Sequence, residues 1–159
     1  MMWSKVSLLL LGLILMGQRA IQLEKRYVIL SPTESENAAK YVSRWPQETV
    51  NGTWALSQSD VDGLESNIYH IADIPFPHPA YKGSQIPHPE KYYRQYAGVI
   101  LNGRKIIYIN ALCEAAGNDG ESYWREKFVF VYDGGKCFWN VRYDPETKIF
   151  SLLQVNGLA

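Results

Sequence analysis

The clearest folding signal in the sequence is the stretch Val99–Leu112, which reads VILNGRKIIYINAL. The Asn102-Gly103 pair in its middle is typical of the two-residue turns that connect antiparallel strands, because both positions require positive φ. The flanking segments, Val99–Leu101 and Arg104–Leu112, are rich in the branched and aromatic residues that strands favour. The sequence therefore predicts a β-hairpin here.

Three more strands are expected toward the carboxyl end. Aromatic residues alternate with valine in Lys127–Tyr132, the period of two that a half-buried strand shows. Turn residues at Asp133-Gly134-Gly135 and Asp144–Thr147 then delimit two further strands, Cys137–Tyr143 and Ile149–Val155. Residues 97–159 are thus predicted to form an antiparallel sheet.

Two helices are expected before the hairpin. Ser31–Glu34 reads SPTE, which combines a capping serine, a proline at the first helical position and a glutamate three residues after the cap. This helix should end at Pro46. Ser57 can cap a second helix, whose buried face would consist of Val61, Leu64, Ile68 and Ile71.

The remaining segments of the first half are shorter. Tyr27–Leu30 suggests an edge strand, Asn51–Thr53 a turn, and the proline-rich residues 74–89 an extended surface loop. Pro89 is expected to open a third helix over Glu90–Tyr96. The predicted fold class is α+β, with helices packed on one face of a four- to five-stranded antiparallel sheet, the architecture of cystatin-like folds.

The first twenty residues have the order of a secretory signal peptide. Lys5 precedes the apolar run Val6–Met16, and Gly17–Ala20 follows it. The run is too short for a bilayer, which needs about 20 apolar residues. We therefore expect a signal at 1–20 and a single domain at 21–159, with a helical and proline-loop part at 21–96 before the sheet. Gln18 is a poor residue beside a cleavage site, so an uncleaved anchor stays open.

Charge identifies no partner. The 159 residues carry 16 basic and 16 acidic side chains, so no net field would attract nucleic acid or an anionic membrane. Contact with a membrane is expected only through an uncleaved signal. No cofactor is implied either, because the sequence contains no glycine-rich phosphate loop.

Cys113 and Cys137 are the two cysteines of a chain expected to be exported. A disulfide is the default in an oxidising compartment and would contribute about 3 kcal/mol. Buried inert thiols and a reactive thiol are the alternatives, although no histidine lies within twenty residues of either cysteine. If the disulfide forms, the segment 114–124 must return along the sheet, so that the strand ending at Leu112 lies antiparallel to the one starting at Cys137.

Polar and aromatic residues of the second half are the candidates for a binding face. Arginine, tyrosine and tryptophan are the usual centre of a protein interface, although an aromatic-rich core would contain the same residue types. The residues that we single out are Arg94, Tyr96, Asn110, Trp124, Asp133 and Trp139.

A resemblance rests on five motifs, which are YYRQYAG at 92–98, YINALC at 108–113, DGGKCF at 133–138, VRYD at 141–144 and VNGLA at 155–159. In this combination the chain resembles a set of small exported bacterial proteins of unknown function. The resemblance implies an exported location and supports pairing Cys113 with Cys137, and it implies no mechanism.

Two classes of function follow. The first is a secreted or periplasmic binding module that acts by contact with a protein or a cell-envelope component. The alternative is a small hydrolase or metal-dependent enzyme that uses His78 or His88 with Asp133 or Glu114. The three histidines lack the close spacing of structural zinc sites, so no metal ligand is assigned.

Overall fold

The computed structural model describes residues 25–44, 48–76, 85–114 and 122–157. The predicted signal peptide lies outside these residues. The described part forms a six-stranded sheet in the order β1-β3-β4-β5-β6, with β2 also paired to β3. The strands are β1 (Tyr27–Ile29), β2 (Val50–Thr53), β3 (Tyr93–Leu101), β4 (Arg104–Leu112), β5 (Phe138–Asp144) and β6 (Ile149–Val155). The helices are α2 (Pro32–Val42), α3 (Gln58–Glu65) and α4 (Tyr123–Glu126), with short 3-10 helices at Ile68–Asp73, Pro89–Lys91 and Gly135–Cys137.

The hairpin predicted from Asn102-Gly103 is confirmed and is longer than expected. β3 and β4 pair over their whole length, from Tyr93 opposite Leu112 to Leu101 opposite Arg104. Asn102 and Gly103 both have positive φ, 50° and 77°. The helix predicted over Glu90–Tyr96 is wrong, because backbone pairing with two neighbouring strands extends these residues and leaves only a 3-10 turn after Pro89.

The sheet is mixed rather than antiparallel. β1 runs parallel to the first half of β3, with Tyr27 opposite Arg94. β2 runs antiparallel to the second half of the same edge, where Val50 lies opposite Leu101. The turn predicted at Asn51–Thr53 is therefore wrong: these residues belong to β2, where the register shifts by a bulge.

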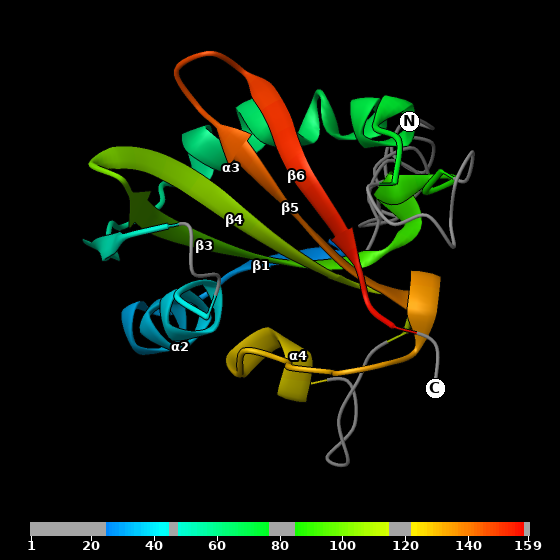
Figure 1. Cartoon of the computed structure of the whole chain (residues 1–159), viewed down its shortest axis with the longest axis horizontal. Helices are drawn as coiled ribbons and strands as arrows, with labels where there is room; N and C mark the ends of the chain where they lie inside the picture. The colour runs from blue at the N-terminus through cyan, green and yellow to red at the C-terminus, as the bar shows by residue number, and fades with distance from the viewer. Residues whose placement is uncertain (1–24, 45–47, 77–84, 115–121, 158–159) are drawn as a thin grey trace, which may run out of the picture.

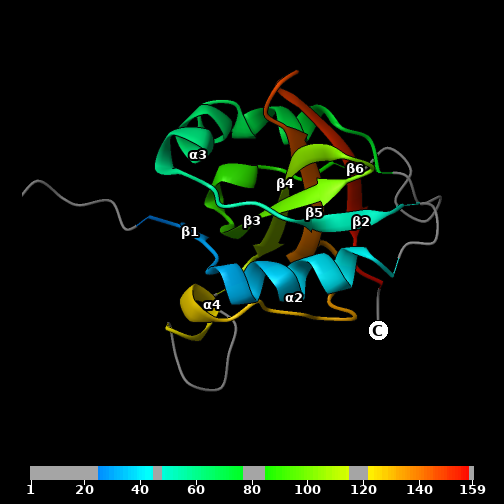
Figure 2. The same ribbon diagram turned by 90° about the vertical axis from the view of Figure 1, so that its left-hand side faces the viewer.

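Helices cover both faces of the sheet, which corrects the prediction of helices on one face. Figures 1 and 2 show α3 on one side of the sheet and α2 with α4 on the other. The physical reason is that both sides of β3 are apolar. Tyr96, Ile109 and Val141 point to one side of the sheet and pack against α3. Ala97, Val99 and Tyr108 point to the other side and pack against α2.

The Cys113–Cys137 disulfide joins the end of β4 to the start of β5. β4 and β5 are antiparallel neighbours, with Leu112 opposite Phe138, as the disulfide required. The backbone N–H of Cys113 also donates to the carbonyl of Cys137 at 2.8 Å. The predicted disulfide and the antiparallel pairing of β4 with β5 are therefore confirmed. The return along the sheet that was predicted for 114–124 is not borne out: residues 115–121 lie outside the described residues, and Trp124 packs beside Leu112, at the same end of the sheet.

Lys127–Tyr132 is not a strand, although its alternation predicted one. It crosses the α2 face of the sheet as an extended segment that side chains hold. The amide of Gln95 accepts from the Val129 N–H at 2.9 Å and donates to the carbonyls of Trp124 and Lys127, both at 2.6 Å. Side-chain hydrogen bonds thus replace the strand pairing that the period of two suggested.

Glu34, at the start of α2, also binds the segment Lys127–Tyr132. Its carboxylate accepts from the Phe128 N–H at 2.9 Å and pairs with Lys127 at 3.4 Å. Burial, the largest influence, raises the pKa of Glu34, but hydrogen bonds from Phe128 and Asn37 and the Lys127 ammonium outweigh it, so this pKa lies below its ordinary value. The predicted capping box is therefore half formed: Ser31 caps the Glu34 N–H, and the Glu34 side chain turns to Phe128 instead.

The second predicted helix starts as expected. Ser57 and Asp60 form a complete capping box at the start of α3. The buried face continues through Ile68 and Ile71, although the chain there is a 3-10 helix. The proline-rich segment departs from a pure surface loop, since Phe76 and Ile86 at its described ends are buried in the same core.

Candidate functional site

The structure does not bring the six predicted binding residues together on one surface. Alternation along the strands separates them into two groups, one beneath α3 and one beneath α2 and α4. Only Asp133 is exposed, whereas both tryptophans and Tyr96 are buried. The α3 side holds Arg94, Tyr96 and Trp139, and the other side holds Asn110 and Trp124.

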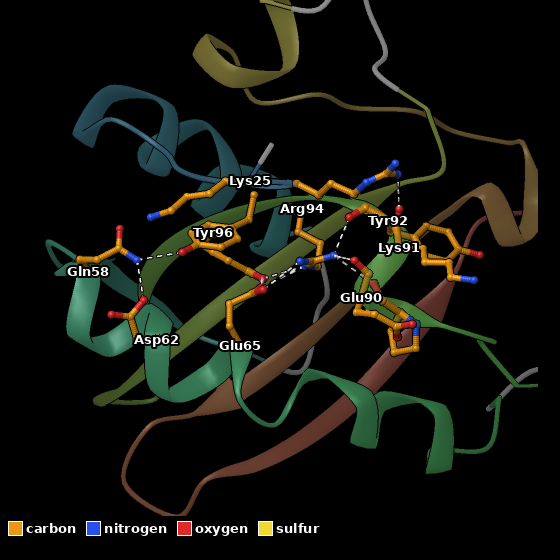
Figure 3. A network of polar contacts seen from close by, with 12 residues as sticks. Lys25, Gln58, Asp62, Glu65, Glu90, Lys91, Tyr92, Arg94 and Tyr96 are labelled. Atoms are coloured by element: carbon orange, nitrogen blue, oxygen red, sulfur yellow. Dashed lines mark hydrogen bonds and ion pairs between the residues drawn. The ribbon is translucent and has the colours of Figure 1, made fainter. Parts of the chain in front are cut away.

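Arg94 is the centre of a closed polar network (Figure 3). Its guanidinium donates to both carboxylate oxygens of Glu65, at 3.1 and 2.9 Å, and to the Tyr96 hydroxyl at 2.9 Å. Its third nitrogen donates to backbone carbonyls, including that of Glu90 at 2.8 Å. With 3% of the side chain exposed and every nitrogen engaged, Arg94 has no free group to offer a ligand.

Tyr96 completes this network by donating its hydroxyl hydrogen to Glu65. Burial raises the pKa of Tyr96 well above 10, and the partly opposing charges of Arg94 and Glu65 leave it there. The phenol is therefore neutral at physiological pH. The network connects α3 to β3, and we interpret it as a structural tie between a helix and the sheet rather than as a binding site.

An open aromatic site lies on the opposite side of the sheet. We call it the aromatic hollow, and its lining residues are Tyr41, Arg44, Phe130, Val131 and Tyr132, around a volume of about 240 Å³. Tyr41 lies in the last turn of α2 and Arg44 just after its end, and the other three residues belong to the extended segment after α4. The hollow therefore joins two parts of the chain about ninety residues apart.

Three rings form the apolar part of the hollow. Phe130 lies between the tyrosines, with ring centroids 4.6 Å from Tyr41 and 4.3 Å from Tyr132. The tilted and edge-on angles of 57° and 79° are those that aromatic pairs prefer. Tyr132 is 77% exposed, so its ring is available at the surface of the hollow.

Arg44 supplies the charge of the hollow. Its guanidinium lies 5.2 Å from the Phe130 ring centroid and 5.8 Å from that of Tyr41, within cation–π range. It forms no ion pair with any residue that the structure describes. Burial raises the pKa of the Tyr41 phenol, and the Arg44 charge only partly opposes this. The hollow thus presents three aromatic rings and one guanidinium that has no acidic partner in the described part of the chain.

A buried polar layer lies beneath the hollow. Tyr108 of β4 contacts Tyr41 at 6.5 Å between ring centroids, and its hydroxyl has no hydrogen-bond partner among the described residues. Opposite it on β5, Arg142 forms an ion pair with Glu48. This second cation is therefore neutralised by its acidic partner, whereas Arg44 has no acidic partner among the described residues.

The residues of the enzymatic alternative show no shared site in the described part of the chain. The carboxylate beside His88 is that of Glu90, at 3.3 Å, and both side chains are exposed. His78 lies outside the described residues, and Glu114 and Asp133 are exposed. Within the described ranges, no three histidine, cysteine or acidic side chains converge as metal ligands would.

Sequence reasoning missed the aromatic hollow. Tyr41 and Arg44 belong to no motif, and the alternation that includes Phe130 and Tyr132 predicts a strand. The available signal was the spacing of Tyr41 and Arg44, three apart on one helix face. Nothing in the sequence places that face against residues 130–132.

No protein-family model, curated protein or solved structure matches the chain. Among the described residues, the helices are all too short or too polar to span a bilayer.

Proposed function

We propose that this chain is an exported binding module that contacts a protein or a cell-envelope component through the aromatic hollow. The observation that carries the proposal is a surface cluster of three aromatic rings beside an arginine that forms no ion pair with any described residue. Tyrosine and arginine are enriched where binding energy concentrates in protein interfaces.

The location of the module is supported by three features. The first twenty residues have the order of a secretory signal. The Cys113–Cys137 disulfide is consistent with an extracellular or other oxidising compartment. The resemblance of residues 92–159 to small exported bacterial proteins points the same way. The binding role does not depend on a cystatin-like arrangement of the fold, which stays a prediction.

Internal hydrogen bonds on both sides of Phe130 hold the loop of the hollow in place, which favours binding. Before Phe130 in the chain, the Val129 N–H donates to Gln95 and the Phe128 N–H donates to Glu34. Downstream, the Asn156 amide donates to the carbonyls of Val131 and Asp133, at 2.5 and 3.1 Å. Ordering this loop therefore adds little cost on association.

Photo-crosslinking in the cells that export the protein tests this proposal. A photoreactive phenylalanine replaces Tyr132 at the hollow or, as the matched control, Tyr69, which is 55% exposed and lies on the α3 side. We expect a discrete adduct from position 132 that is absent from position 69 and is reduced by Tyr41→Ala. Identical adducts at both positions, or none at position 132, would refute a binding role for the hollow.

A further inference from the structure

We infer that the aromatic hollow accepts an apolar side chain of a partner protein that is flanked by an acidic residue. This inference rests on the binding role proposed above and specifies its ligand. It follows from the size of the hollow, the chemistry of its lining and the charge of Arg44.

The size favours one anchoring side chain over a whole small molecule. The hollow is open to solvent and has a volume of about 240 Å³. Pockets for small molecules generally measure about 300 to 1,000 Å³ and bury most of the ligand. Protein interfaces, in contrast, commonly place a single aromatic or aliphatic anchor in a shallow pocket with a polar rim.

The lining favours an apolar anchor. Phe130 and Val131 are wholly apolar, and Tyr41 and Tyr132 contribute ring faces and edges. The polar groups of the five lining residues' side chains are two hydroxyls and one guanidinium. A sugar presents many hydroxyls, each of which must exchange its water for a protein partner. The lining has too few such partners, so an apolar protein side chain fits better.

The charge favours an acidic neighbour of that anchor. The Arg44 guanidinium already lies over the rings of Tyr41 and Phe130, so a cationic ligand would meet both a repelling charge and occupied ring faces. Arg142 beneath is neutralised by Glu48. A carboxylate can instead accept two hydrogen bonds from the planar guanidinium, which remains stacked on the rings.

The test uses the full chain with its disulfide intact and a panel of fluorescein-labelled hexapeptides. The peptides place phenylalanine, leucine or alanine next to glutamate, glutamine or lysine. We expect the Phe-Glu and Leu-Glu peptides to bind about tenfold more tightly than their lysine counterparts in fluorescence anisotropy, as a charge-assisted bidentate contact predicts. Amide NMR shifts should be confined to Tyr41–Arg44 and Phe130–Tyr132.

A pair of charge reversals on α2 and its end provides the control. Arg44→Glu should reverse the preference for glutamate over lysine. Lys40→Glu makes the same change of charge one turn away, at an exposed residue that does not line the hollow, and should preserve the preference. Circular dichroism verifies that both variants fold.

Several outcomes would overturn the inference. These are equal affinity for glutamate and lysine peptides, no peptide binding, shifts located elsewhere, or equal effects of the two reversals. Binding of oligogalacturonate at the hollow, in place of acidic peptides, would identify an acidic glycan and would leave the binding role intact. Absence of a crosslink at position 132 is the separate result that refutes the binding role itself.

Discussion

Replacing Gln95 by methionine should destabilise the domain and release one wall of the aromatic hollow. Gln95 is fully buried on β3, and its amide makes four hydrogen bonds. Three of these hydrogen bonds are with backbone groups of Trp124, Lys127 and Val129. The fourth is donated by the Asn110 side chain. Methionine has similar length but can replace none of them.

The magnitude follows from these contacts. A typical hydrogen bond contributes about 1 kcal/mol net, and a buried group left without its partner costs more. Four bonds therefore predict a loss of about 4 kcal/mol, reduced to about 3 where the released segment regains water. Asn110→Ala removes two bonds, to Gln95 and to the Val129 carbonyl, and should cost about half as much.

Urea unfolding, followed by tryptophan fluorescence and circular dichroism, measures both losses. Hydrogen exchange at the Val129 amide should accelerate in the Gln95 variant before global unfolding contributes. Peptide binding at the hollow should weaken in parallel, because Phe130 and Tyr132 follow this anchor directly. A loss below about 1 kcal/mol for Gln95→Met, or a larger loss for Asn110→Ala, would refute the reasoning.

Three further outcomes concern backbone space, the disulfide and pH. Gly98→Ala should lower the unfolding midpoint sharply, because the added methyl group would lie 2.2 Å from the Trp54 carbonyl oxygen. Gly63→Ala meets open space inside α3 and should raise the free energy of unfolding by up to about 1 kcal/mol. Equal effects of the two substitutions in urea titrations would contradict this geometry. The Cys113–Cys137 disulfide joins residues 24 apart, and its reduction should lower the free energy of unfolding by about 3 kcal/mol. Thermal unfolding with and without reductant measures this loss, and an unchanged midpoint would contradict the prediction. Because its pKa is depressed on folding, Glu34 stabilises the domain above its ordinary value of 4.5, and this contribution should disappear as pH falls through the lower folded pKa. The stability difference between the native chain and Glu34→Gln should therefore shrink from pH 7 to pH 3, and a constant difference would exclude this origin.

The elements that local chemistry controls were predictable. The Asn102-Gly103 turn has a conformation that few other residue pairs adopt, so the hairpin was legible. Ser57 and Asp60 cap α3 through contacts within four residues. The two cysteines required a particular strand pairing, and β4 and β5 have it.

The failures occurred where distant partners compete with local preference. Tyr93–Tyr96 follows a helix-starting proline, but β1 and β4 pair with it and make it a strand. Lys127–Tyr132 has a strand-like alternation, but Gln95 and Asn156 provide its hydrogen bonds in place of a neighbouring strand. The mixed sheet has the same origin, because the parallel pairing of β1 joins segments more than sixty residues apart.

The candidate site divides in the same way. The sequence by itself determined which chemical groups the chain carries and the hairpin at Asn102-Gly103, because the turn depends on local conformation. It also limited any disulfide within the chain to Cys113 and Cys137, because there are only two cysteines. Only the tertiary structure decided that Arg94 and Tyr96 are internal, while Arg44 and Tyr132 are at the surface. Burial depends on what packs against a side chain, and here the second helical layer and the segment held by Gln95 come from distant parts of the chain.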